Sequence, residues 1–205
     1  MDIIQTIKEE LQVEKWQVEA AVKLIDEGNT IPFISRYRKE VTGSLNDEQL
    51  RNLDERLNYL RNLEEKKEQV LKSIEEQGKL DEELKEKILA AETLVVVEDL
   101  YRPYRPKRRT RASVAKEKGL EGLAVYILSQ DAPNPIEEEA QKYVSEEKEV
   151  ASAAEAIQGA KDIIAESISD NADYRAYIRN ATVEEGVVIS TAKDEKTESV
   201  YEMYY

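Results

Sequence analysis

The 205-residue sequence contains no cysteine and no histidine. Without cysteine the chain can form no disulfide and can do no thiol chemistry, which fits a reducing cytoplasm. Without histidine it has no histidine general base, no Ser-His-Asp triad and no histidine metal ligand. These two absences remove most of the common catalytic and metal-binding arrangements.

Glycine, proline and long apolar runs are also scarce. There are seven glycines and five prolines, and no glycine-rich phosphate-binding loop. No apolar run approaches the ~20 residues that a membrane-spanning helix needs, and the first residues lack a signal-peptide pattern. Charged residues make up 36% of the chain and are interspersed with leucine, which is typical of a soluble, highly helical protein that does not enter a membrane.

Clustered carboxylates are present, but their context argues against catalysis. The densest runs, at residues 137–139 and 146–147, fall on predicted helix faces with no strand beside them. A two-metal phosphoryl-transfer site needs carboxylates that converge on a preformed pocket, and nothing in the pattern requires that. We therefore predict a protein that is not an enzyme, with no catalytic residue, no metal ligand and no cofactor.

Apolar residues recur at intervals of three and four through most of the chain, which predicts an all-α fold. The first three helices are short and joined by tight turns, so they resemble a helix-turn-helix unit. The predicted helices span residues 2–11, 16–27, 32–40, 47–77, 81–91, 93–101, 113–118, 120–128, 136–144, 152–168 and 173–184.

The helix over residues 47–77 has the clearest start signal. Asn46 and Gln49 have the spacing of a capping box, and Leu45 and Leu50 that of a hydrophobic staple. Leucines 50, 53, 57 and 60 then form a regular seam. A helix this long needs partners along its length, so we interpret it as a strut between helical subdomains. A homodimeric coiled coil is the alternative, although the seam is regular for only about two heptads.

Two segments are ambiguous. Val95, Val96 and Val97 are β-branched and favour a strand, whereas the flanking acidic residues and the apolar spacing favour a helix, which is the prediction. After Gly186 the tail is predicted either as a short hairpin or as a continuation of helix. The chain is predicted to comprise a helix-turn-helix-like subdomain (residues 1–45), a strut with following helices and a loop (46–111), and a C-terminal helical subdomain (112–205).

One short stretch reverses the charge of the chain. Residues 102–111, the basic segment, hold six cationic side chains and no carboxylate in a chain whose net charge is −14. Pro103 and Pro106 prevent a helix here and predict an extended, stiff loop. Arginine forks on such a loop suit phosphate oxygens, and tyrosine rings suit a base or a guanidinium.

The predicted nucleic-acid-binding residues come from this segment, from the tyrosines beside it and from the third helix. The alternative for the loop is that its arginines dock onto the protein's own carboxylates. The alternative for the third helix is that Phe33, Ile34 and Tyr37 pack inward while its cations are solvated. The full set is Tyr101, Arg102, Tyr104, Arg105, Lys107, Arg108, Arg109, Arg111, Arg36, Arg38 and Lys39.

Several ordered motifs resemble the Tex family of bacterial transcription accessory proteins. Residues 31–43 read Ile-Pro-Phe-Ile-Ser-Arg-Tyr-Arg-Lys-Glu-Val-Thr-Gly, like the signature near the N-terminus of that family. Residues 16–21, 98–101 and 104–112 resemble further family motifs in the same order. The resemblance extends through about residue 185 and is specific in its motifs rather than compositional.

The resemblance implies a longer, multi-domain cytoplasmic protein that acts in transcription and is similar to the core of a eukaryotic elongation factor. In the family, a helical N-terminal region with a helix-turn-helix portion is followed by an RNase-H-like domain of the YqgF type, helix-hairpin-helix elements and an OB-type RNA-binding domain. We expect this chain to be the N-terminal fragment, ending before the RNase-H-like domain.

Two functions stay open at this point. The chain can be a nucleic-acid-facing module, with RNA or DNA bound weakly by the fragment alone. It can instead be an interaction scaffold that braces the absent C-terminal domains or contacts the transcription machinery, including RNA polymerase, without binding nucleic acid itself.

Overall fold

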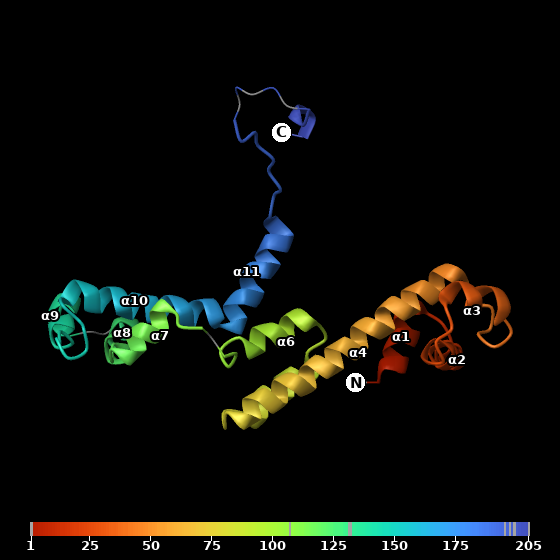
Figure 1. The fold of residues 1–205 in the computed structure, drawn as a ribbon, viewed down its shortest axis with the longest axis horizontal. Coiled ribbons are helices and arrows are strands. Elements are labelled where there is room, and N and C mark those ends of the chain that lie inside the picture. The colour runs from red at the N-terminus through yellow and green to blue at the C-terminus, as the bar shows by residue number, and fades with distance from the viewer. Residues whose placement is uncertain are drawn as a thin grey trace. The chain divides into compact units, whose positions relative to one another are not determined.

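The computed structural model of the chain describes residues 2–106, 108–130, 133–194, 196, 198 and 200–204. The chain divides into two compact units, Met1–Tyr101 and Arg102–Tyr205 (Figure 1). The three-part division expected from the sequence stays a prediction.

The described residues form eleven α-helices, one short 3₁₀ turn and no β-strand, which confirms the all-α prediction. None of these helices is both long enough and apolar enough to cross a membrane. The helices are α1 (Ile3–Leu11), α2 (Lys15–Asp26), α3 (Ile31–Tyr37), α4 (Asp47–Glu76), α5 (Glu82–Ala90), α6 (Leu94–Tyr101), α7 (Arg111–Glu117), α8 (Glu121–Ser129), α9 (Ile136–Gln141), α10 (Ala153–Asp170) and α11 (Ala172–Glu185), and the 3₁₀ turn is η1 (Glu202–Tyr204).

The long helix α4 begins as its capping signal predicts. The Gln49 backbone N–H donates to Asn46 Oδ1 at 2.8 Å, and the Asn46 N–H donates to Gln49 Oε1 at 3.0 Å. Leu45, just outside the helix, and Leu50, in its first turn, are both buried. The reciprocal bonds satisfy amide groups that a helix start leaves unpaired, so the position of this start is fixed locally.

The leucine seam of α4 is covered within the same chain. Its leucines at positions 50, 53, 57, 60 and 63 are buried, and α1, α2 and α3 pack on its N-terminal half (Figure 1). Arg56 of α4 holds Glu10 of α1 at 2.6 Å, and Arg61 holds Asp26 at the end of α2 at 2.7 Å. The seam is therefore filled without a second chain.

Helices α5 and α6 cover the rest of α4. The Val95–Val97 stretch lies inside α6, so the helix prediction is confirmed and the strand alternative is wrong. The side chain of Lys67 on α4 is 2% exposed; its ammonium donates to the Leu89 carbonyl at 2.9 Å and lies 2.9 Å from a Glu64 carboxylate oxygen. Burying a charge in this way requires such partners.

Two predictions about helix ends and the tail are wrong. The third helix ends at Tyr37 rather than at residue 40, because residues 38–44 form turns in which the Thr42 N–H donates to the Arg38 carbonyl. No hairpin forms among the described residues of the tail, where only η1 is regular. An isolated pair of strands with no third strand or helix to cover it is marginal in water.

The second unit is built around α10, against which α7, α8 and α9 pack. Small residues allow the close approach: Ala112, Ala115, Ala124, Ala156 and Ala160 all lie in the buried core. A methyl group at Gly159 of α10 would come within 2.4 Å of the Leu120 side chain. By contrast, α11 buries none of its residues.

Replacing Lys67 with methionine is expected to destabilise the chain by about 1–3 kcal/mol, because the Glu64 carboxylate and the Leu89 carbonyl lose a donor away from water. Lys72→Met is the matched control, since Lys72 is exposed on the same helix. Urea unfolding measures both variants. Equal midpoints for the two variants would contradict the structural role of the Lys67 ammonium.

The pair between Asp26 and Arg61 predicts a pH dependence. The hydrogen bond from Arg61 holds the pKa of the Asp26 carboxyl below its ordinary value. A lowered folded pKa contributes stability above the unfolded pKa, about 3.9, and that contribution is lost as the pH falls through the folded value. The stability gap between wild type and Asp26→Asn should therefore close below about pH 4; a gap of constant size across that range would count against the pair.

Candidate nucleic-acid interface

The basic segment is held at both ends by one face of α10. Asp162, Glu166 and Asp170 are spaced four residues apart on that helix, and we call them the carboxylate ridge. Asp170 Oδ1 lies 3.0 Å from Arg102 Nε, and Glu166 Oε1 accepts a hydrogen bond from Thr110 Oγ1 at 3.0 Å. Residues four apart share a helix face, so the ridge aligns the loop along α10.

Thr110 performs two tasks at the end of the segment. Its hydroxyl oxygen accepts from the Ser113 N–H at 3.0 Å, and the Ser113 hydroxyl oxygen accepts from the Thr110 N–H at 2.8 Å. This reciprocal cap starts α7. The same Thr110 hydroxyl donates to Glu166, so the start of α7 is fastened to α10 by one side chain.

The six predicted cations of the segment differ in how strongly they are engaged. Arg102 meets Asp170, which is only 9% exposed, so this pair matches the docking alternative. Arg109 and Arg111 have side chains 75% and 87% exposed and touch Glu117 and Asp162 only at 3.5 and 4.0 Å. Pairs this open contribute little and leave the charge available.

The remaining predicted residues of the segment are distributed differently. Arg105 is exposed and interacts with another residue of the protein. Arg108 is exposed and forms no ion pair with any described residue. Lys107 lies outside the described residues. Tyr104 is half-buried, and Tyr101, in the first unit, is half-buried with its hydroxyl 3.0 Å from that of Ser73. The predicted stacking faces of these tyrosines are therefore partly covered.

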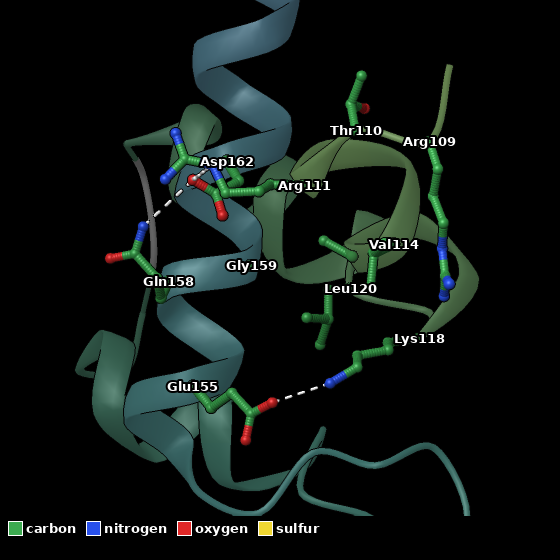
Figure 2. Close-up of a pocket in the computed structure, with 11 residues that line it drawn as sticks. Arg109, Thr110, Arg111, Val114, Lys118, Leu120, Glu155, Gln158, Gly159 and Asp162 are labelled. Carbon is green, nitrogen blue, oxygen red and sulfur yellow. Dashed lines mark hydrogen bonds and ion pairs between the residues drawn. The ribbon is translucent and has the colours of Figure 1, made fainter. Parts of the chain in front are cut away.

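A groove of about 550 Å³ lies between α7 and α10 at the end of the basic segment (Figure 2). Val114, Leu120 and Gly159 line it, together with Arg109 and Arg111 of the basic segment. Lys118 also lines the groove, and its Nζ is 2.8 Å from Glu155 Oε1. The hydrogen bond from this ammonium, together with the Ala151 N–H, holds the pKa of the Glu155 carboxyl below its usual range.

The groove is therefore lined by two arginines of the basic segment and by Lys118, with the carboxylates of Asp162 and Glu155 beside Arg111 and Lys118. Lys118 and the ridge carboxylates were missed by sequence reasoning about this site. The four-residue spacing of positions 162, 166 and 170 indicates an acidic helix face, but the sequence does not predict which cations contact that face.

The predicted cations of the first unit lie at and just beyond the end of α3. Arg36 is in its last turn, and the Arg38 guanidinium lies 4.9 Å from the centre of the Phe33 ring. Among the apolar side chains expected to pack inward, Ile34 is buried, Phe33 is half-buried and Tyr37 is exposed. The inward prediction therefore holds for Ile34, holds in part for Phe33 and is wrong for Tyr37, which is the last residue of this short helix.

Replacing Thr110 with valine should destabilise the second unit by about 1–2 kcal/mol, since it removes the helix cap and the bond to Glu166 together. Thr191→Val, at an exposed position, is the matched control. Thermal unfolding and amide hydrogen exchange at residues 111–117 report the effect. Exchange rates in α7 that match the control would show that the cap does not hold this helix.

Comparison with known proteins finds two family descriptions that match parts of this chain. The description "Tex-like protein N-terminal domain" matches residues 1–75, and "Tex central region-like" matches residues 131–205. The YdcI protein of Bacillus subtilis is 48% identical over 204 residues, which is 98% of this chain and 28% of that protein.

Two further relatives carry functional names. The transcriptional accessory protein Tex of Neisseria gonorrhoeae is 47% identical over 180 residues, 88% of this chain and 23% of its own length. The human S1 RNA-binding domain-containing protein 1 is 30% identical over 193 residues, 93% of this chain and 19% of its own length. The chain thus spans about a quarter of the relatives it matches, and with two of the family's regions matched in order, it belongs to the Tex family.

Proposed function

We propose that this chain is a non-catalytic helical module of a Tex-like transcription accessory protein, and that it contacts nucleic acid through the basic segment. The observation that carries the proposal is the exposure of Arg108, Arg109 and Arg111 in a chain with a net charge of −14. At cellular salt the screening length is about 8 Å, so acidic faces elsewhere do not cancel a local cationic surface.

The geometry supports phosphate contact more than base reading. Arginine forks suit phosphate oxygens, and the segment is fixed by Asp170 at one end and by Glu166 at the other. A loop ordered beforehand loses less conformational freedom on binding. The names of the Neisseria and human relatives, with their words for transcription and RNA binding, point the same way.

The partners and location belong to the same proposal. RNA or DNA is the expected ligand, bound weakly by this chain alone, in the cytoplasm and in association with the transcription machinery. Three phosphate contacts are few, and each contributes mainly through release of counterions.

A scaffold function is the second candidate, and the Arg102–Asp170 pair favours it. This pair uses one predicted phosphate-binding cation to fix the segment against α10. A segment fixed in this way can also present its arginines to acidic surfaces of the regions that the longer relatives contain. In that case the remaining part of a relative, titrated into this chain, would bind through the same arginines.

The test is fluorescence anisotropy of labelled single- and double-stranded oligonucleotides with the whole chain across a range of salt. Replacing Arg108, Arg109 and Arg111 with alanine should flatten the slope of log K against log salt by roughly 2–3 on duplex DNA, at about 0.9 per phosphate contact. The measured affinity at low salt should fall with it.

A charge-matched variant supplies the control. Lys72, Lys79 and Lys161 are exposed, and replacing them with alanine changes the net charge by the same amount. If both triple variants keep the wild-type slope, the basic segment makes no phosphate contacts. If only binding to the remaining part of a relative is lost, the scaffold function holds instead.

A further inference from the structure

A second surface, on the first unit, combines exposed aromatic rings with cations. Trp16, in the first turn of α2, is 51% exposed, and Tyr37, at the end of α3, is 66% exposed. The turn that follows α3 is tied to α2, because Gln17 Nε2 donates to the carbonyls of Thr42 and Gly43 at 3.3 and 3.0 Å. The two helix ends and this turn therefore form one surface, which we call the α2–α3 surface.

Gly43 holds the tryptophan ring in place. A β-carbon at this position would lie 2.4 Å from Cη2 and 2.9 Å from Cζ2 of Trp16, so the six-membered ring of the indole rests against the bare glycine. The glycine also has a φ of +60°, which side-chain-bearing residues rarely adopt. One part of the indole is thus packed against the turn while about half of the residue stays open to solvent.

The cations beside these rings form no ion pairs with residues that the structure describes, unlike the other arginines of this unit. Arg51, Arg56 and Arg61 each pair with a carboxylate at 2.6–2.7 Å. Arg36, Arg38 and Lys39 form no ion pair with any described residue. Arg38 instead lies over the Phe33 ring and donates to the Tyr37 carbonyl.

Two carboxylates belong to the same surface, one in the turn after α3 and one at the start of α2. Glu40 follows directly in the turn and is exposed, and Glu14 accepts at the cap of α2. Neither forms an ion pair with the three cations among the residues that the structure describes. The surface therefore carries a local excess of positive charge next to open aromatic faces.

We propose that the α2–α3 surface binds single-stranded nucleic acid, with bases stacked on Trp16 and Tyr37 and phosphates met by Arg36 and Lys39. Exposed rings beside cations are the combination that recognises single strands without reading sequence. A duplex hides its base faces, so it cannot use the rings. The proposal shares the nucleic-acid role proposed above but concerns a different surface, and the two can fail separately.

The sequence offers a direct probe, because Trp16 is the only tryptophan in the chain. Its intrinsic fluorescence can be titrated in the whole protein with a 15-nucleotide oligouridine RNA, the matching oligothymidine DNA, and inorganic polyphosphate. A stacked base should quench the indole, so both oligonucleotides are expected to quench. Polyphosphate carries charge but no bases and should leave the emission nearly unchanged.

Tyr37→Ala removes an exposed ring without touching the core and should weaken binding of oligouridine roughly fivefold to a hundredfold, the range for losing one stacked base. Tyr177→Ala, an exposed tyrosine on α11, is the matched control and should bind like wild type. Arg36→Ala with Lys39→Ala should flatten the salt slope by about 0.7 for each single-strand phosphate that these two cations neutralise.

The outcomes separate the two proposals. The stacking proposal would be overturned if oligouridine binds by anisotropy while the Trp16 emission stays unchanged. Equal affinities of Tyr37→Ala and Tyr177→Ala for oligouridine would also overturn it, as would binding of a protein partner but of no oligonucleotide at this surface. Quenching that persists in the Arg108, Arg109 and Arg111 triple variant would support it even if the basic segment proves inactive. Binding restricted to duplex DNA and abolished in that triple variant would overturn it and leave the basic-segment function standing.

Discussion

The pairing between the carboxylate ridge of α10 and the basic segment is the constraint on which the second unit's candidate site depends. Asp170 and Glu166 hold Arg102 and Thr110, and Thr110 in turn starts α7. The ridge thus fixes the ends of the loop while leaving arginines between and just after them open to solvent. Within this one segment Arg102 is docked onto the protein's own carboxylate, whereas Arg108, Arg109 and Arg111 are exposed, as the proposed binding to a ligand would require. A loop with no ion pair to its own protein would be poorly ordered. A loop with every cation paired to the protein's own carboxylates would have no charge left for a ligand.

Most of the helices could be predicted from sequence because their signals are local. The Asn46 cap, the leucine seam of α4 and the helix through Val95–Val97 each follow from residues within a turn or two. The end of α3 could not be predicted, because the turn after it is fixed by Gln17, which bonds to carbonyls 25 and 26 residues away. The hairpin alternative for the tail is wrong for a different reason, because two strands with no covering layer are marginal in water.

The candidate site was predictable in its charge but not in its pairing. Composition alone locates the cations of the basic segment, and an i,i+4 rule suffices for Arg51 with Asp47. The partners of Arg56 and Arg61 lie 46 and 35 residues away, and that of Arg102 lies 68 residues away. Only the fold decides which arginines are neutralised. The sequence likewise does not predict how Trp16 is placed, because its ring packs against Gly43, which lies 27 residues away in the sequence.

An excess of carboxylates makes an arginine without an ion pair informative. Each unit has more acidic than basic residues, so a nearby carboxylate is the default partner for any cation. Some guanidinium groups have no carboxylate partner among the described residues, although they lie on a turn or loop that long-range hydrogen bonds hold in place. Because the backbone is ordered there, random motion of the loop does not explain why these arginines are unpaired. Exposed ion pairs contribute little stability, so forgoing them costs the fold little while keeping a positive surface. A protein of strongly negative net charge can in this way meet a polyanion at chosen places, since repulsion beyond about 8 Å is screened, and its overall acidity limits non-specific adhesion elsewhere.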